Sequence, residues 1–257
     1  MIQRFSRFKL EFEHKIAVVT MIRSEKKNAL DMTTIEELES ICRLLNSSSE
    51  INVAVLTGEN GVFSAGGDIT EWGELSPDQF SNIWLREGNR TFDALAQLRQ
   101  PLIAVLNGVT YGGGLELAAC ADLRIAETTC KLGQPETSIG VVAGWSGTQR
   151  LVRRFGAQPV RRMLLCGEIF SAKDAKLLGL VDFVVPVGEG LSYAATIANK
   201  LCARSPIASQ VAKSMVNAAE REGAENAIDM LAGRLVTSED DVIEGISAFK
   251  EKRAPRY

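Results

Sequence analysis

Two glutamates, Glu116 and Glu136, stand in sequence surroundings that suit acid–base chemistry. Glu116 follows three consecutive glycines and is flanked by leucines and alanines at the expected start of a helix. Burial there raises a carboxyl pKa, whereas the helix dipole lowers it. Glu136 ends the loop sequence 133–136, Gly-Gln-Pro-Glu. Paired carboxyls can take one proton while giving another. The alternatives are a dipole-stabilised helix residue for Glu116 and a loop acid capping Thr137 or a nearby amide for Glu136.

Two glycine-rich segments, 58–69 and 107–117, each follow an expected strand. Glycine lets main-chain N–H groups approach a ligand with no Cβ in the way. One free amide from each loop, aimed at one carbonyl oxygen, would form an oxyanion hole. Neither segment carries the lysine of a P-loop or the G-x-G-x-x-G of a dinucleotide site, which argues against both. Tight turns without a ligand are the alternative.

Histidine is nearly absent from the chain, which has 1 His, His14, between Glu13 and Lys15 at a strand boundary. A His-rich metal site is therefore excluded, and a Ser-His-Asp triad would have to use this residue. We expect His14 to be a surface turn residue. Any acid–base chemistry must come from carboxylates.

Composition excludes several function classes. The chain has 257 residues, with 29 Lys plus Arg against 32 Asp plus Glu, so it lacks the basic charge of a nucleic-acid binder. No apolar run is long enough to span a membrane, and the start of the chain does not have the pattern of a secretory signal. The 5 cysteines are widely spaced and form no C-x-x-C pair. They are typical of a reducing compartment, and we expect a cytoplasmic protein.

Alternating strands and helices must position these residues. Apolar runs and turn signals predict strands over 8–12, 16–22, 53–57, 101–106, 123–126, 130–133 and 181–185. Capping and periodicity predict helices that begin near Thr33, Ser76, Gly114, Thr148 and Ser171. From about residue 188 onward the chain reads as helices with no apolar centre of their own, which favours an oligomer.

Taken together, the motifs resemble the enoyl-CoA hydratase/isomerase (crotonase) superfamily, from Asn28 to Arg253. The resemblance implies an α/β fold, a crotonase-like spiral of repeated ββα units over 1–187. It also implies a C-terminal helical region over 188–257, which mediates oligomerisation into a homotrimer or a dimer of trimers and contacts CoA. The motifs that carry it lie at 63–69, 107–117, 133–136 and 147–151.

The resemblance also implies an activity and the residues that perform it. Gly67 and Gly113 correspond to the two main-chain donors that polarise the thioester carbonyl. Glu116 and Glu136 correspond to the two hydratase acids: the first helps to activate water for attack on C3, and the second supplies the proton to C2. The expected reaction is the reversible syn addition of water to a 2-enoyl-CoA, a lyase reaction that needs no metal and no cofactor, since coenzyme A is part of the substrate.

Further residues are implied to contact the acyl-CoA substrate. The family's Arg-Pro-Lys is replaced here by Arg23-Ser24-Glu25, and a solvated charge run is the alternative for the lysines that follow. We interpret Asp68 as a residue that orders its loop. The implied contacts are Lys26, Ala65, Gly66, Asp68, Ile69, Phe249 and Lys252.

Trp145 departs from the glycine-rich sequence that hydratases carry before Thr148-Gln149-Arg150-Leu151. The indole either reshapes the acyl pocket or packs outward on a neighbouring helix. We assign Trp72 and Trp84 to core or interface packing.

Two alternative functions are open. One is an enoyl-CoA isomerase or another specialised acyl-CoA lyase of the same superfamily. The other, of a different class, is a non-catalytic acyl-CoA-binding or scaffold homologue. A pure binder needs only the amides, so the two acids argue against it.

Overall fold

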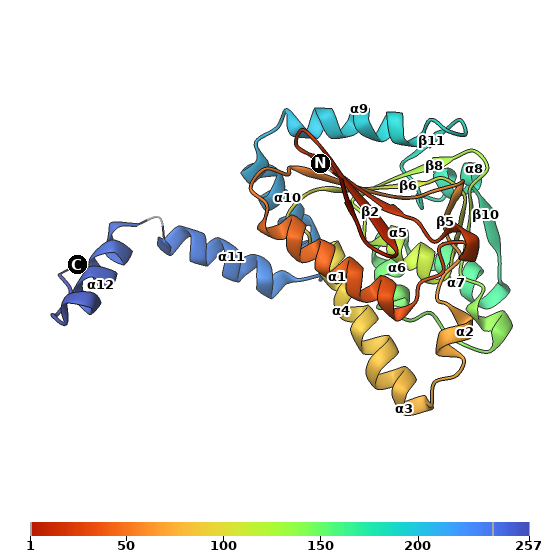
Figure 1. Ribbon diagram of the computed structural model, residues 1–257, viewed down its shortest axis with the longest axis horizontal. Helices are drawn as coiled ribbons and strands as arrows, with labels where there is room; N and C mark the ends of the chain where they lie inside the picture. The colour runs from red at the N-terminus through yellow and green to blue at the C-terminus, as the bar shows by residue number, and fades with distance from the viewer. Residues whose placement is uncertain (1, 238, 257) are drawn as a thin grey trace. The chain divides into compact units, whose positions relative to one another are not determined.

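The computed structural model describes residues 2–237 and 239–256 (Figure 1). The chain divides into two compact units, Met1–Gln210 and Val211–Tyr257. The first unit contains both sheets and every residue of the pocket described below.

The larger sheet has seven strands in the order β1-β2-β3-β4-β6-β8-β11. The first three strands pair antiparallel, and the remaining pairs, from β3 to β11, are parallel. The strands predicted from apolar runs are all present, and a short N-terminal strand, β1, joins them. Their bounds are β1 Ile2–Arg4, β2 Phe8–Glu13, β3 Ile16–Met21, β4 Val53–Gly58, β6 Leu102–Leu106, β8 Leu123–Glu127 and β11 Phe183–Val185.

Both faces of the larger sheet are covered, which explains why its central strands are continuous apolar runs. Along β4, Val53 and Val55 pack with the apolar residues of α9 (Gly190–Cys202), whereas Ala54 and Leu56 belong to the larger core. That core includes α1 (Met32–Ser47) and α4 (Arg86–Ala96). Figure 1 shows α9 on one side of the sheet and α1 and α4 on the other.

A second sheet brings the two glycine-rich segments together. Its order is β10-β9-β7-β5, and β5 pairs parallel with β7. Of its strands only β9 was expected; β5 and β7 lie inside segments that we interpreted as loops. The bounds are β5 Val62–Ser64, β7 Val109–Tyr111, β9 Lys131–Gly133 and β10 Ile169–Ser171.

Helix starts follow local capping. The predicted Ser76 cap is present: Ser76 accepts from the Gln79 N–H, and the Gln79 side chain accepts in return. The first long helix begins at Asp31 rather than at Thr33, because the Asp31 carboxylate accepts from the Thr34 N–H. The helices of this unit not yet given are α2 Ile69–Trp72, α3 Pro77–Gln79, α5 Gly113–Ala119, α6 Gly147–Phe155, α7 Ala157–Cys166 and α8 Ala172–Leu177, with the 3₁₀ turns Ser24–Lys26 and Glu136–Ile139.

The helix that starts at Ser76 contains an irregularity that the sequence does not predict. Between α3 and α4 the chain forms a π-helix over Phe80–Leu85. Such bulges are rare and often occur at functional sites. This one carries Trp84, which faces the pocket described below.

The predicted boundary at 187/188 separates a catalytic core from a region for oligomerisation and CoA contact, and it stays a prediction. The two compact units divide at 210/211. The physical reason is α9, whose Ala194 and Ala198 are fully buried against the sheet and so belong to the first unit. The helix α10 (Pro206–Ala219) crosses the boundary.

The second unit contains α11 (Ala224–Thr237) and α12 (Asp240–Glu251). Both helices carry large apolar side chains that are exposed in the single chain: Ile228, Met230, Leu231, Leu235, Val236, Ile243, Ile246 and Phe249. None of the helices in residues 2–237 and 239–256 combines the length and the apolar character needed to cross a membrane.

Candidate active site

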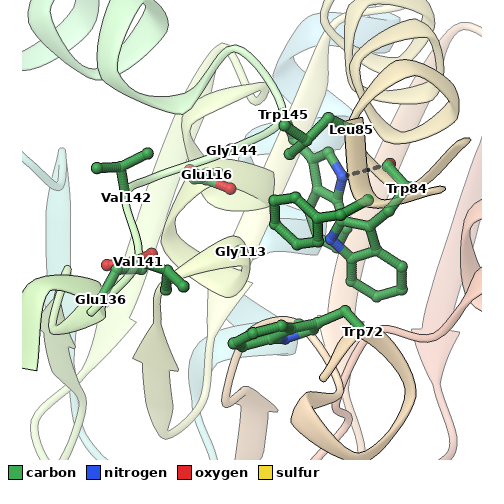
Figure 2. A pocket seen from close by; sticks show the side chains of 12 residues that line it. Trp72, Trp84, Leu85, Gly113, Glu116, Glu136, Val141, Val142, Gly144 and Trp145 are labelled. Atoms are coloured by element: carbon green, nitrogen blue, oxygen red, sulfur yellow. Dashed lines mark hydrogen bonds between the residues drawn. The ribbon is translucent and has the colours of Figure 1, made fainter. Parts of the chain in front are cut away.

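One pocket contains five of the residues singled out from the sequence: Gly67, Gly113, Glu116, Glu136 and Trp145 (Figure 2). They come from segments far apart in the chain, and the second sheet and α5 bring them together. The pocket encloses about 60 Å³. A single water needs about 10–15 Å³ by the same measure, so the free space admits only a few small groups.

The Gly67 N–H points away from the chain segment around Leu30, with which Gly67 pairs. Gly67 forms a parallel bridge with Leu30, in which the Leu30 N–H donates to the Gly66 carbonyl and the Asp68 N–H donates to the Leu30 carbonyl, each at 2.8 Å. In this pattern the Gly67 N–H lies on the opposite side. It has no acceptor among the described residues.

Gly113 supplies a second free amide. It is the first residue of α5, where an N–H has no partner within the helix. Gly112 before it and Gly66 across from it have φ values of +52° and +101°, which favour glycine. A Cβ on Gly66 would lie 3.2 Å from the Gly113 nitrogen, so the two loops touch.

Glu116 is buried on α5, with 2% of its surface exposed. Desolvation, followed by the nearby charge of Glu136, raises its pKa well above the usual range. The charge of Arg150 and the Gly144 amide act in the opposite direction. Its Oε1 atom is buried and has no hydrogen-bond partner within the described chain. A buried, unpaired carboxyl oxygen costs free energy, which is typical of a group that meets a ligand.

Glu136 begins a 3₁₀ turn after β9 and faces the same pocket. Burial raises its pKa to about 7. When its amide is oriented to suit its neighbours, Gln134 donates to Glu136 Oε1 at 2.6 Å and to Oε2 at 2.9 Å. Gln134 is itself fully buried. These donors favour the carboxylate form and oppose the effect of burial. Sequence reasoning missed Gln134, although it lies inside the motif at 133–136.

A cluster of aromatic rings forms one wall of the pocket. The ring centroid of Trp145 lies 5.0 Å from that of Trp84 and 5.0 Å from that of Phe92. Trp145 is 3% exposed. Its ring also faces Gly113, where a Cβ would lie 2.7 Å from Cζ3. The indole therefore lines this pocket and also packs on a neighbouring helical segment, so both features of the two alternatives are present; its effect on the acyl chain stays a prediction.

Trp72 and Trp84 also line the pocket (Figure 2). The assignment of these two residues to core packing is confirmed, because Trp84 belongs to the core and Trp72 packs against it. The edges of both rings also lie against the site. A Cβ on Gly67 would be 3.1 Å from Trp84 and 3.3 Å from Trp72. The π-helix that carries Trp84 was not predicted, because none of the sequence patterns considered above indicates a π-helix.

The remaining site residues lie as follows. Ala65 and Gly66 lie in the loop that carries Gly67, Ile69 is 55% exposed, and Lys26 is exposed on its 3₁₀ turn. The Asp68 side chain pairs with Arg23 and caps α2. Phe249 and Lys252 belong to the second unit, where Phe249 is 86% exposed and Lys252 ends α12. In the part of the chain that the structure describes, no group of three or more His, Cys, Asp or Glu side chains is arranged to hold a metal ion.

Comparisons with known proteins agree with this geometry. Residues 11–257 match the family described as enoyl-CoA hydratase/isomerase. The short-chain-enoyl-CoA hydratase of Clostridium acetobutylicum is 34% identical, with 95% of this chain and 94% of the relative covered. The crotonyl-CoA hydratase of Syntrophomonas wolfei is 32% identical, with 96% of each covered. The crystal structure of an enoyl-CoA hydratase from Bacillus anthracis superposes with a TM-score of 0.82 at 33% identity, covering 98% of this chain and 99% of the other.

Proposed function

The chain belongs to the enoyl-CoA hydratase/isomerase family, and we propose that it is an enoyl-CoA hydratase that adds water reversibly to a 2-enoyl-CoA thioester. One observation carries the proposal: two carboxyls and two free main-chain amides meet in one small pocket. Relatives that align over nearly the whole chain are named as hydratases of such thioesters, which supports it.

The amides of Gly67 and Gly113 bind the thioester oxygen. Attack of water at C3 moves electrons through the conjugated system, so that this oxygen carries the negative charge of an enolate. Preorganised donors stabilise that charge in a site that is shielded from bulk water. Removing one such donor typically costs about 3–4 kcal/mol of transition-state stabilisation.

The two glutamates move the protons. Glu116 helps to activate the water that attacks C3, and Glu136 supplies the proton to C2. The hydroxyl group and the proton thus add to the same face of the double bond. The pKa shifts support a pair with one shared proton, since burial raises the pKa of both carboxyls and the charge of Glu136 raises that of Glu116 further. The proposed reaction uses no metal and no redox cofactor.

The rest of the acyl-CoA is bound by residues outside the pocket. We assign CoA contacts to Lys26 and to Phe249 and Lys252 of the second unit. The exposed apolar residues of α11 and α12 support a homotrimer or a dimer of trimers, because such faces are normally covered. The five cysteines, which carry thiols and not disulfides, support a reducing, cytoplasmic location.

The decisive assay follows the loss of the enoyl thioester absorbance when the protein meets crotonyl-CoA. We expect saturable loss of the signal and formation of 3-hydroxybutyryl-CoA. Binding of crotonyl-CoA without turnover would instead indicate an acyl-CoA-binding homologue. Conversion of a 3-enoyl-CoA to its 2-enoyl isomer, with no hydration, would indicate an isomerase.

A further inference from the structure

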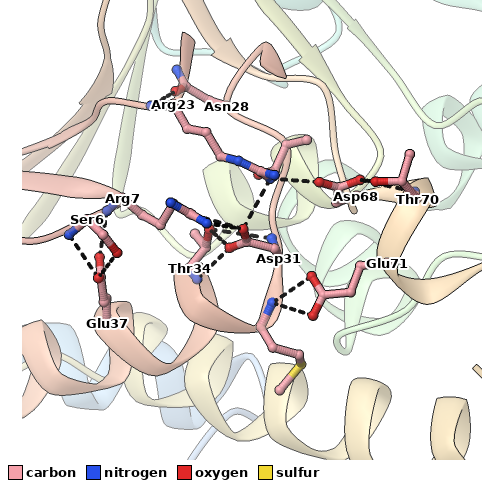
Figure 3. Close-up of polar contacts among 12 residues, drawn as sticks. Ser6, Arg7, Arg23, Asn28, Asp31, Thr34, Glu37, Asp68, Thr70 and Glu71 are labelled. Carbon is pink, nitrogen blue, oxygen red and sulfur yellow. Dashed lines mark hydrogen bonds and ion pairs between the residues drawn. The ribbon is translucent and has the colours of Figure 1, made fainter. Parts of the chain in front are cut away.

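Arg23 connects the two chain segments on either side of the Leu30–Gly67 bridge, which together hold the Gly67 amide. Arg23 Nη1 donates to the Ala29 carbonyl at 2.9 Å and forms ion pairs with Asp68 at 2.8 Å and with Asp31 at 3.3 Å (Figure 3). One guanidinium nitrogen therefore contacts the chain before Leu30 and the residue that follows Gly67.

The position of Gly67 depends on this connection. The N–H groups of Leu30 and Asp68 donate into the bridge that flanks Gly67, so a shift of either segment would rotate the free amide. Asp68 is anchored twice: its Oδ1 atom accepts from the Thr70 N–H, and its Oδ2 atom pairs with Arg23. The helix that Asp68 caps, α2, has only 4 residues and cannot by itself fix the loop.

The network is largely shielded from water. The exposed fractions of the side chains are 15% for Arg23, 7% for Asp68 and 8% for Asp31. Although burial opposes the effect, hydrogen bonds from Thr70 and Arg23 lower the pKa of Asp68. Both carboxylates are thus charged at neutral pH. Removing Arg23 would leave Asp68 with no cation, which is strongly unfavourable for a buried charge.

A neighbouring arginine provides an internal comparison. Arg7 contacts the same Asp31 through Nε at 2.9 Å and Nη2 at 2.8 Å. Asp31 therefore keeps a cation when Arg23 is absent. Arg7 forms its ion pair with Asp31 and not with Asp68, so within the described chain Arg23 alone connects Asp31 to the residue after Gly67.

We propose that Arg23 is a positioning residue, which holds the Gly67 N–H in line with the thioester carbonyl through its contacts with Asp68 and Ala29. This inference rests on the proposed hydratase function. Arg23 is not among the residues that line the pocket, and its guanidinium is engaged by Ala29, Asp31 and Asp68. A lysine would restore the charge, but its ammonium lies on a flexible stem and lacks the rigid, planar geometry that holds Arg23 Nη1 between Ala29, Asp31 and Asp68.

The test compares the variants Arg23→Met and Arg7→Met. The probe is a 2,4-dienoyl-CoA thioester, whose absorption moves to longer wavelength when hydrogen bonds polarise its carbonyl. We expect Arg23→Met to lose most of this shift and to lower kcat by about 10- to 100-fold, because misplacement of a donor by about 1 Å is that costly. KM should change little, and Arg23→Lys should recover only part of the shift. Arg7→Met should stay within about twofold of the wild type, because it leaves Asp68 untouched.

The outcomes separate this inference from the function on which it rests. A wild type that hydrates crotonyl-CoA and shifts the probe, with an Arg23→Met variant that does the same, would contradict the positioning role alone. If the Arg7 and Arg23 variants lost kcat and the absorption shift equally, and their Tm values fell equally, Arg23 would have only a structural role. That outcome would also contradict the positioning role. A wild type that neither hydrates nor shifts the probe would contradict both proposals.

Discussion

The indole Nε1 of Trp145 donates a hydrogen bond of 3.0 Å to the main-chain carbonyl of Trp84. Trp84 lies in the π-helix Phe80–Leu85, so this bond connects the irregular helix to the loop before α6 (Figure 2). Gly88, on the next turn, leaves the space that the indole occupies: a Cβ there would overlap the ring. Two segments distant in sequence thus form one aromatic wall beside the amides.

We predict that this wall limits the acyl chain to a few carbons. Trp145→Ala would open the pocket and should raise the ratio of kcat/KM for octenoyl-CoA over crotonyl-CoA by about tenfold or more, since each additional buried CH₂ contributes about 0.8 kcal/mol. Turnover of a chain-length series measures this. The control Trp145→Phe keeps an aromatic ring and should stay closer to the wild type. An unchanged chain-length profile in Trp145→Ala would place the end of the acyl chain elsewhere.

The contact between Gly147 and Glu116 gives a second prediction. A Cβ on Gly147 would overlap Glu116 Oε1, so Gly147→Ala must displace the carboxyl. We expect kcat to fall by about 100-fold, because a displacement near 1 Å is enough for that loss. The control is Gly233→Ala, where a Cβ would meet nothing within 4 Å. If Gly147→Ala retained full activity, Glu116 would not need its observed position.

Titration of Glu136 should change both the catalytic rate and the free energy of unfolding as the pH varies. Burial raises its pKa to about 7, so the carboxylic acid that we propose as the proton donor to C2 is lost as the pH rises above neutrality, and kcat/KM should fall there. In the unfolded chain this carboxyl ionises at about pH 4.3, so between that pH and about 7 the folded state binds more protons. The free energy of unfolding should therefore decrease with pH across this window, by at most about 4 kcal/mol.

Glu136→Gln removes the titrating group and tests the stability effect directly. Relative to the wild type, the variant should gain stability at pH 8 compared with pH 5, as measured by urea denaturation. A difference that is constant across this range would show that Glu136 ionises normally in the folded protein.

Gln134 should tune the same group. Its amide donates two hydrogen bonds that favour the Glu136 carboxylate. Gln134→Leu removes them, so the pKa of Glu136 should rise and the alkaline limb of the pH–rate profile should move to higher pH. The control Gln79→Leu alters a surface capping interaction and should leave the profile in place. A limb that moved to lower pH in Gln134→Leu would contradict this role.

How much of the fold could be predicted from the sequence depends on how many consecutive residues carry the pattern that indicates each element. The strand at 53–57 and the Ser76 cap were predictable because an apolar run or a capping pattern marks each locally. The strands β5 and β7 have 3 residues each, too few to show alternation, and their glycines favour a loop interpretation.

The site shows the same division. Glu116, Glu136 and the two glycines, which line one pocket, could be singled out because their motifs are contiguous in sequence. Trp84 and Arg23 act through contacts with residues far along the chain, at Trp145 and Asp68, and only folding brings these pairs together. The α1 cap at Asp31 was missed for a related reason, because Thr33 and Glu36 also match the capping pattern locally.

The central claim is that Glu116 and Glu136 act as one unit on one thioester. The most direct test measures crotonyl-CoA hydration by Glu116→Gln, Glu136→Gln and the double variant, with Glu50→Gln, an exposed loop residue, as control. We expect each single change to lower kcat by about 100-fold or more with CoA binding retained, and the double variant to be little slower than either one. If the two losses in free energy add in full, or if either single variant keeps wild-type turnover, the two acids do not share the reaction.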